Sequence, residues 1–336
     1  DGRWPVPGWT DEYEWEGFVR FADLPRAYNP PEGVIVTANH AVTVRGAGPY
    51  LTDDWAYGYR ARRIADRLPV ADMAELQLDS PHPLAPVLVP YLLRVPGTPA
   101  EARRLLERWD HRQEADSAGA AYFNAVWRRL LALTFHDQLP EAARPAGGDR
   151  WFEVVRGLLA RPDDPWWDDV RTARTVESRD AVLRRAMTEA YAELRDRLGP
   201  DPAAWRWGDL HTLELTHQSL GSSGISLLER LFNRGPYRLA GGKDAVNATG
   251  WDAREGYRVT AVPSMRMVVD LADLDASRWI NLTGASGHAF HANHADQAEL
   301  WAAGRTIPMR HTAPAVRAAA VATLTLVPGP GAGPAG

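Results

Sequence analysis

Two polar residues end an apolar run near the start of the sequence. The stretch NPPEGVIVTANH, residues 29–40, begins with turn-forming residues and continues as a β-branched run typical of a strand. The run stops at Asn39 and His40, an amide and an imidazole, instead of at another turn. Polar side chains at the end of a core-like strand need an explanation, and that explanation requires the rest of the chain.

A second group of polar residues lies in the stretch GASGHAFHANH. Its three histidines are spaced three residues apart, at His288, His291 and His294. Imidazoles together with a carboxylate such as Asp296 could bind zinc. The glycines of the stretch argue against one helix face that presents all three rings, so a zinc hydrolase is only a distant alternative. His211 and His217 are interpreted as packing or hydrogen-bonding residues.

Adjacent carboxylates in YLTDDWAYGYR allow two interpretations. Asp53 and Asp54 could bind a hard cation through their oxygens. They could equally cap the helix expected just after them, which is the simpler interpretation from these residues alone. The arginines that follow, Arg60, Arg62 and Arg63, are by default a solvated helix face with packed stems.

Several chemistries are excluded by missing residues or motifs. The sequence has no cysteine, no G-x-S-x-G nucleophile motif and no Gly-rich phosphate loop. The net charge of −5 and the pI of about 6.1 argue against nucleic acid as a partner. No stretch approaches the roughly 20 apolar residues of a membrane span.

The elements that carry these residues change in type along the chain. We expect strands and loops in residues 1–60, a mainly helical region in 61–235, and strands with a C-terminal loop in 236–310. Residues 311–336 are expected to form a terminal strand and a disordered Pro/Gly tail. Strands that resume after a helical region indicate an α+β fold with a large helical insertion.

Helical periodicity is clear in five stretches. Each places apolar residues three or four apart, opposite arginines. The longest, RDAVLRRAMTEAYAELRDRLG, closes on Gly199-Pro200, a good stop signal. The other four are YRARRIADRL, TPAEARRLLERW, AAYFNAVWRRLLALTF and WFEVVRGLLARP.

A set of ordered motifs resembles the penicillin acylase (penicillin amidase) family. The resemblance begins with DGRWPVPGWTDEYEWEGFVRFADLPRAYNPPEGVIVTANH and continues through YLTDDWAYGYRARRIADRL. It extends through PDDPWWDD, WGDLHTLELTH, GGKDAVNATG and VPSMRMVVDLADL to GASGHAFHANHADQAELWAAGRTIPM. Each match is weak alone, but together they run in order from residue 1 to about 310.

The resemblance implies an N-terminal nucleophile hydrolase with a four-layer αββα sandwich. Family members are cut autocatalytically, and the freed α-amino group of the β chain's first Ser activates that residue's own hydroxyl. This sequence corresponds to the C-terminal portion of the β chain. The nucleophile, the α chain and the N-terminal part of the β chain are therefore expected outside it, and the chain alone is expected to be inactive.

The same resemblance assigns roles to two residues. Asn39 falls on the family's oxyanion donor, which answers the question raised by its position at the end of an apolar run. Arg60 falls on the active-site arginine, whose role is electrostatic and orienting. His40 stands where the family often has Asn.

A structural calcium site is also implied by the resemblance. Asp53 matches one carboxylate ligand, with Asp54 as an alternative in register, and the carbonyl of Gly2 matches a backbone ligand. The remaining ligands would lie outside this chain.

We therefore expect the parent protein to hydrolyse a linear amide, either the acyl side chain of a β-lactam or an N-acyl homoserine lactone. The family favours a periplasmic or secreted location over a cytoplasmic one. Neither a nucleic acid nor a membrane is expected as a partner. The alternative is a truncated, non-catalytic homologue that serves as a binding or structural subunit.

Overall fold

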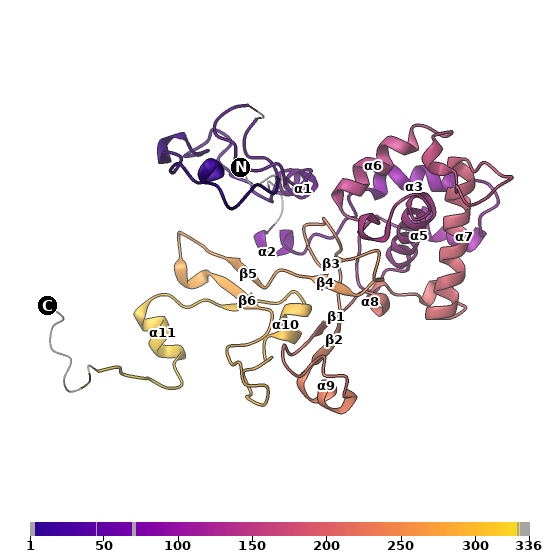
Figure 1. Ribbon diagram of the computed structural model, residues 1–336. Helices are drawn as coiled ribbons and strands as arrows, with labels where there is room; N and C mark the ends of the chain where they lie inside the picture. The colour runs from indigo at the N-terminus through magenta and orange to yellow at the C-terminus, as the bar shows by residue number, and fades with distance from the viewer. Residues whose placement is uncertain (1–3, 45, 69–71, 328, 330–336) are drawn as a thin grey trace. The chain divides into compact units, whose positions relative to one another are not determined.

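The computed structural model describes residues 4–44, 46–68, 72–327 and 329. The chain divides into two compact units, residues 1–263 and 264–336 (Figure 1). The break falls inside the stretch expected to form returning strands. This division does not test the boundaries of the four segments expected from the sequence, and those boundaries stay a prediction.

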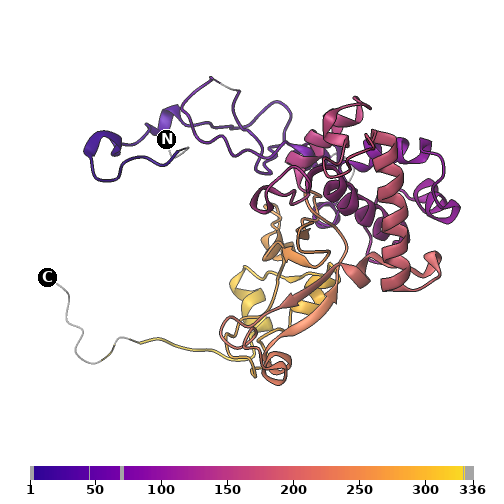
Figure 2. The ribbon, with the colours of Figure 1, turned by 45° about the vertical axis from the view of Figure 1, so that its right-hand side comes forward.

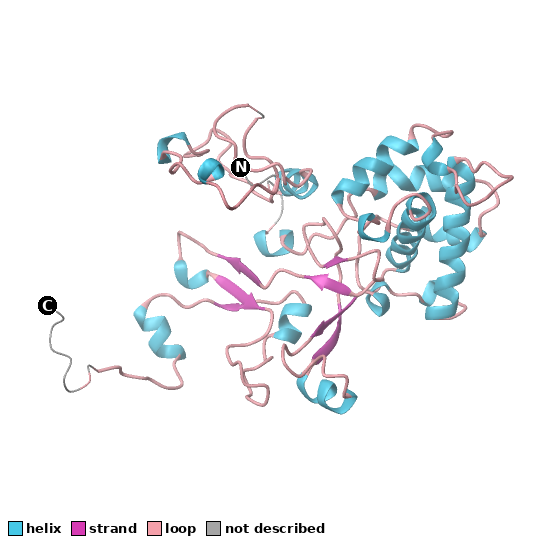
Figure 3. Cartoon of the chain, viewed as in Figure 1, coloured by secondary structure: helices cyan, strands magenta, loops and turns pink. Residues whose placement is uncertain are grey.

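The N-terminal segment, residues 4–58, is mostly loop (Figure 3). Its regular elements are two 3-10 turns, Asp11–Tyr13 and Phe21–Asp23, and one parallel bridge between His40 and Ala56. The strand expected before Asn39 is not formed among the described residues, so that prediction was wrong for this chain. A strand needs backbone partners on a neighbouring strand, and the described residues supply none here.

Residues 59–210 form the helices expected from the periodicity. After α1 (Tyr59–Arg67) and the short α2 (Met73–Leu76), six further helices follow: α3 (Ala85–Arg94), α4 (Ala100–Arg108), α5 (Ala118–Phe135), α6 (Asp149–Leu159), α7 (Arg179–Leu198) and α8 (Trp207–Leu210). We call α3 to α8 the helical body. All five predicted helices are confirmed, as α1, α4, α5, α6 and α7, and α2, α3 and α8 are additional.

Local sequence explains where these helices begin and end. The hydroxyl of Ser117 accepts from the amide of Ala120 at the start of α5, and Ser178 caps α7 in the same way. Gly199 follows α7 with φ of 100°, a conformation that glycine adopts without steric cost.

The core lies around α5. Its residues from Gly119 to Trp127 are buried on every side, because α4, α7 and α8 pack against it (Figures 1 and 2). Aromatic side chains dominate this core. Those with almost no exposure include Trp127, Trp167, Trp205, Trp207, Tyr122, Phe123, Phe135 and Phe152.

Short antiparallel strands complete the first unit. Strand β1 (Thr212–Leu215) pairs with β2 (Arg234–Arg238), and α9 (Ser226–Phe232) lies between them in sequence. Strand β3 (Gly250–Trp251) pairs with β4 (Val259–Ala261). Among the described residues of this unit no larger sheet forms.

The second unit is built on a three-stranded antiparallel sheet in the order β5-β6-β7 (Figure 3). Strand β5 (Met265–Val268) pairs along its whole length with β6 (Arg278–Asn281), which also pairs with β7 (Ile307–Pro308). Helix α10 (Ala298–Ala302) packs against β6. The strands expected in GYRVTAVPSMRMVVDLADL are confirmed as β4 and β5.

The terminal strand expected after residue 310 was wrong. The described part of this stretch contains a helix instead, α11 (Ala313–Ala319), capped by the hydroxyl of Thr312. Its sequence APAVRAA is rich in alanine, the best helix former, and its proline falls in the first turn, where a missing N–H costs nothing. Most of the Pro/Gly tail, residue 328 and residues 330–336, lies outside the described residues. In the part of the chain that is described, no helix is long and apolar enough to cross a membrane.

Candidate active site

Asn39 sits at a left-handed turn of the backbone. Its φ is 64°, a region that asparagine tolerates better than most residues. Its carbonyl accepts from the amide of Ala56 at 2.9 Å, beside the bridge between His40 and Ala56. Residues 39–40 and 56–58 therefore lie side by side, and Gly58, whose added Cβ would contact Cβ of His40 at 3.9 Å, leads directly into α1.

Arg60 in the first turn of α1 reaches back to this turn. Its Nη2 donates to Oδ1 of Asn39 at 2.8 Å. A guanidinium only donates, so the oxygen of the Asn39 amide must face it. The Nδ2 group of Asn39 then points away from Arg60, with no acceptor among the described residues. The two residues predicted from the sequence are thus brought together by the fold.

Neighbours of Arg60 in sequence anchor α1 on α6. The hydroxyl of Tyr59 bonds to the carboxylate of Glu153, and Nη2 of Arg156 donates to the same hydroxyl at 2.6 Å. The ring of Tyr59 also packs edge-on against Phe152, with centroids 5.6 Å apart. Burial and the Glu153 carboxylate raise the pKa of Tyr59 well above its ordinary value.

A second anchor comes from Arg63, one turn later. Its guanidinium donates to both oxygens of Asp79, at 2.5 and 3.2 Å, and Arg112 donates to the same carboxylate at 3.0 Å. Burial acts to raise the pKa of Asp79, but the two arginines hold it below its ordinary value. The interpretation of Arg63 as a solvated side chain was therefore wrong. It holds for Arg62, which pairs with Asp66 at the surface.

These anchors are what the sequence reasoning missed. Tyr59 and Arg63 lie four residues apart, so their side chains leave the same face of α1, one toward Glu153 and the other toward Asp79. The periodicity of YRARRI contained that signal, but a tyrosine and an arginine are too common on solvated faces to identify it without the fold.

Asp53 and Asp54 are exposed in the loop that precedes α1. Asp53 is one of the residues that line a hollow of about 580 Å³, together with neighbours in the same loop such as Thr43, Tyr50 and Trp55. Neither residue caps α1, because its N-cap is Gly58 and no side chain bonds there, so the capping interpretation was wrong. Within the described ranges no three acidic or imidazole side chains gather as a metal site. The calcium site at Asp53 stays a prediction, and Gly2 lies outside the described residues.

The three late histidines do not converge. Nδ1 of His288 and Nδ1 of His291 accept from backbone amides two residues later, at 3.2 and 3.0 Å. Nδ1 of His294 pairs with the carbonyl of Ser286 at 3.0 Å. The rings therefore stabilise their own loop, and the zinc alternative gains no support.

The two other histidines singled out above have structural roles. His211 is buried, bonds to the carbonyl of Tyr257 and to Thr249, and stacks on Trp207. Burial lowers the pKa of His211 to about 4, so it is neutral at pH 7. His217 accepts from two backbone amides of its own turn. The interpretation of both as packing or hydrogen-bonding residues is confirmed.

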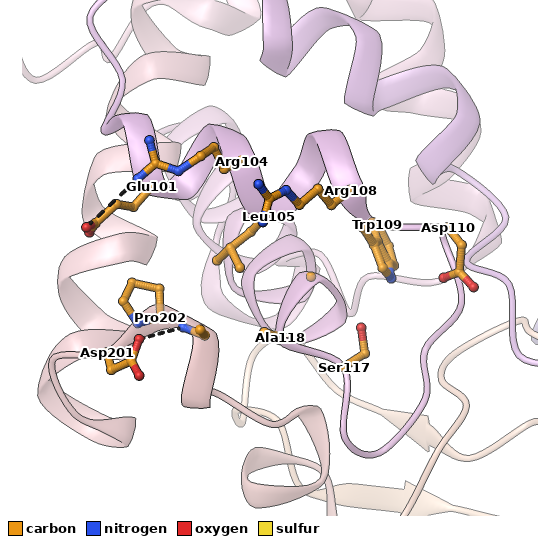
Figure 4. Close-up of a pocket in the computed structure, with 12 residues that line it drawn as sticks. Glu101, Arg104, Leu105, Arg108, Trp109, Asp110, Ser117, Ala118, Asp201 and Pro202 are labelled. Carbon is orange, nitrogen blue, oxygen red and sulfur yellow. Dashed lines mark hydrogen bonds and ion pairs between the residues drawn. The ribbon is translucent and has the colours of Figure 1, made fainter.

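A hollow of about 530 Å³ lies away from Asn39 and Arg60, between α4 and the turn at Pro202 (Figure 4). Its charged lining is of mixed sign, with Arg104 and Arg108 beside Glu101 and Asp201. None of these side chains is buried. It has no nucleophile activated by a neighbouring base, so we do not place the chemistry there.

Comparison with known proteins now gives this geometry a context. A model of the penicillin amidase family matches residues 1–318. The chain is 32% identical to a penicillin acylase 2 proenzyme of a Pseudomonas species (strain SE83), over 98% of this chain and 43% of that protein. It is 28% identical to an acyl-homoserine lactone acylase of Pseudomonas aeruginosa, over 91% of this chain and 41% of that protein. It thus spans less than half the length of these relatives.

A solved structure shares the fold. The thermostable penicillin G acylase of Alcaligenes faecalis matches 94% of this chain and 61% of its own, with a TM-score of 0.54 and 18% identity. The predicted α+β class and N-terminal nucleophile hydrolase fold are confirmed by this likeness. With the family model matched over nearly the whole sequence, the chain belongs to the penicillin amidase family.

Proposed function

We propose that this chain carries two active-site residues of an amidohydrolase that cleaves a linear amide. The named relatives are acylases, one of penicillin and the other of acyl-homoserine lactones. The substrate of the present protein is an amide of one of these two kinds. Because the chain spans less than half of either relative, the activity belongs to a longer or assembled protein.

The contact between Arg60 and Asn39 is the observation that carries the proposal. The arginine occupies the amide oxygen of Asn39 and turns its Nδ2–H groups outward. A neutral donor held in this way suits the oxyanion of a tetrahedral intermediate, where negative charge develops. The charge of Arg60 adds electrostatic stabilisation at the same place.

The nucleophile in this proposal is an N-terminal Ser on a segment outside this sequence. Its hydroxyl attacks the amide carbonyl and its own α-amino group takes the proton. The amine leaves, and water releases the acid from the acyl-enzyme. The 336-residue chain alone should therefore show no amidase activity, because hydroxyl and α-amine must belong to one residue.

A second polypeptide segment is the proposed partner. The N-terminal segment exposes a series of large aromatic side chains that a folded protein normally covers. They are Trp4, Trp9, Trp15, Phe18, Phe21 and Tyr28. The α chain and the N-terminal part of the β chain would cover them and supply the strands that residues 33–39 lack. Asp53 would complete its calcium set in the same assembly, in a periplasmic or secreted compartment.

Substitution of Asn39 in the complete, processed enzyme tests the proposal. Asn39→Ala should lower kcat by about 10²- to 10³-fold with little change in KM, because the donor acts on charge present only in the tetrahedral state. Asn39→Asp should be at least as damaging, since it places a carboxylate where negative charge develops. Asn293→Ala, at an exposed asparagine of the late loop, is the matched control and should keep kcat.

Processing must be confirmed by gel before kinetics are measured, because precursor cleavage passes through a similar oxyanion. A correctly processed Asn39→Ala enzyme that keeps kcat within a few-fold would overturn the assignment. Asn39 would then only stabilise its own turn or a neighbouring loop. A complete protein that shows no amidase activity even with Asn39 intact would instead favour the alternative, a truncated homologue that binds without catalysis. The DNA upstream of Asp1 gives an independent check, since an open frame encoding Gly-Ser before a strand supports the enzyme.

A further inference from the structure

The backbone between Asn39 and Arg60 is held at one point by a residue far away in sequence. The amide of Tyr57 donates to Oδ2 of Asp149 at 2.8 Å. Tyr57 follows Ala56, which bonds to Asn39, and precedes Gly58, the N-cap of α1. This one amide therefore lies between the two attachments that set Asn39 and Arg60 relative to each other.

Asp149 is suited to hold that amide rigidly. It is the first residue of α6, and its Oδ1 accepts from the amide of Arg150 at 2.8 Å while Oδ2 accepts from Tyr57. Both oxygens are thus used by backbone donors. Two short bonds leave the carboxylate little rotational freedom, so the position of Tyr57 follows the position of α6.

The N-terminus of α6 is in turn held by a hydrogen bond to Asp244. Its Oδ2 accepts from the amide of Asp149 at 2.8 Å. Asp244 has φ of 58°, in a tight loop whose Gly241 amide bonds to the carbonyl of Gln113 at 2.8 Å. A Cβ on Gly148 would lie 3.0 Å from that Oδ2, so glycine permits the close approach.

The carboxylate of Asp244 also interacts electrostatically with Arg60. Burial raises the pKa of Asp244 and the charge of Asp149 raises it further, whereas Arg60 and Lys243 lower it. Arg60 is therefore close enough for its charge to act on Asp244. The polar chain from Asp244 through Asp149 ends at the amide of Tyr57, which lies in sequence between Ala56, the partner of Asn39, and Arg60.

We infer that Asp149 is a positioning residue for the reaction, which holds the Tyr57 amide and thereby sets the Asn39 amide and the Arg60 guanidinium in their catalytic arrangement. In this role it acts through the Tyr57 amide and not directly on the reacting atoms. This inference rests on the proposed function of Asn39 and Arg60. Its effect should fall on turnover, because a small displacement of an oxyanion donor weakens the transition state more than substrate binding.

Three variants of the complete, processed enzyme test this role. Asp149→Ala removes the acceptor and should lower kcat about 10- to 100-fold with KM changed less than about threefold. Asp149→Asn keeps an acceptor oxygen and should retain kcat within about threefold. Asp149→Glu keeps the charge but moves it by one methylene, and should resemble Asp149→Ala.

Asp180→Ala is the matched control, because Asp180 also lies in the first turn of a long helix but, among the residues that the structure describes, its side chain pairs only with its neighbour Arg179. It should leave kcat unchanged. Hydrogen exchange gives a readout that needs no activity: the peptide containing Tyr57 should exchange at least tenfold faster in Asp149→Ala than in Asp180→Ala. If Asp149→Ala fails to fold, the comparison of Asp149→Asn with Asp149→Glu decides.

The outcomes separate this inference from the proposed function. If Asn39→Ala loses turnover while Asp149→Ala and Asp149→Glu match the Asp180→Ala control in kcat and in exchange, the positioning role is overturned and the function stands. If Asn39→Ala keeps turnover, the proposed function is overturned, and the positioning role with it.

Discussion

The helical body and the N-terminal segment differ in what holds them together. The helical body encloses a core of aromatic and aliphatic side chains around α5, many with no exposure at all. None of the described residues from 4 to 58 is buried, and Trp15 and Phe18 are 87% and 95% exposed. Yet Asn39 belongs to the exposed segment, and Arg60 begins the helix that follows it.

This difference in burial means that one region of the chain supplies most of its stability and another carries the residues assigned to the chemistry. Burial of apolar area stabilises the helical body, at about 25 cal/mol per Å². The site is attached to α6 of the helical body through Tyr57 and Tyr59, and Arg63 adds an ion pair to Asp79, which precedes α3. A segment with so little burial of its own has its geometry determined by these contacts and by whatever covers it.

The largest expected effect is in the helical body. Phe123→Ala should lower the free energy of unfolding by about 3 to 5 kcal/mol, because its ring is fully buried against His82 and Trp109. Turnover per folded molecule should stay within about twofold, since no site residue touches the ring. Chemical denaturation and active-site titration measure the two quantities. A large fall in kcat per folded molecule would show that body and site are not separable, and Phe123→Leu gives a milder version if the alanine variant does not fold.

The next effect tests whether the exposed segment is covered in the complete enzyme. Phe18→Ser should destabilise the complete enzyme by roughly 1.5 to 3 kcal/mol, the value of burying one large apolar side chain. In the 336-residue chain the same change should leave the melting temperature unaltered, because the side chain is already exposed. Equal effects in both proteins would contradict the proposed partner segment.

The third prediction concerns the polar anchor of α1. Asp79→Asn should cost about 1 to 3 kcal/mol at pH 7, toward the lower end because Arg63 and Arg112 are each more than one-third exposed. The folded pKa of Asp79 lies below the unfolded value, so its contribution is present above about pH 4 and is lost as pH falls through the folded pKa.

Denaturant titrations at pH 7 and at pH 3 measure this difference between wild type and variant. The gap in unfolding free energy should narrow at the lower pH. A gap that is independent of pH would mean that the charge of Asp79 is not what holds Arg63.

The smallest effect is expected at Asp53. If Asp53 is a calcium ligand in the complete enzyme, Asp53→Ala should abolish the stabilisation that calcium gives, about 1.4 kcal/mol at ten times its Kd. Turnover should change little, because the ion supports assembly and not the reaction. Thermal melts with calcium and with chelator measure this, with Asp54→Ala as the alternative ligand. If the melting temperature of the complete enzyme is the same with calcium and with chelator, the calcium site does not exist.

Much of the helical fold could be predicted from periodicity and stop signals, as α7 and its Gly199 end show. Helix α3 was missed, because APVLVPYLLR is apolar nearly all round and contains Pro90, so neither amphipathic period nor composition marks it as a helix. The strand before Asn39 failed for the opposite reason. Its residues favour extended structure, but the hydrogen-bond partners of a strand lie elsewhere in the molecule.

The sequence by itself determined where five amphipathic helices lie, that no thiol chemistry is available, and, through the order of its motifs, which family the chain belongs to. Those properties depend on local propensity, composition and motif order, all of which can be read from residues that are close together in the sequence. Only the tertiary structure decided that Arg60 donates to Asn39, that Arg63 pairs with Asp79, and that Asp149 accepts from the amide of Tyr57. These contacts join residues 16 to 92 positions apart, and a hydrogen bond over such separations exists only after packing has brought its two ends within about 3 Å.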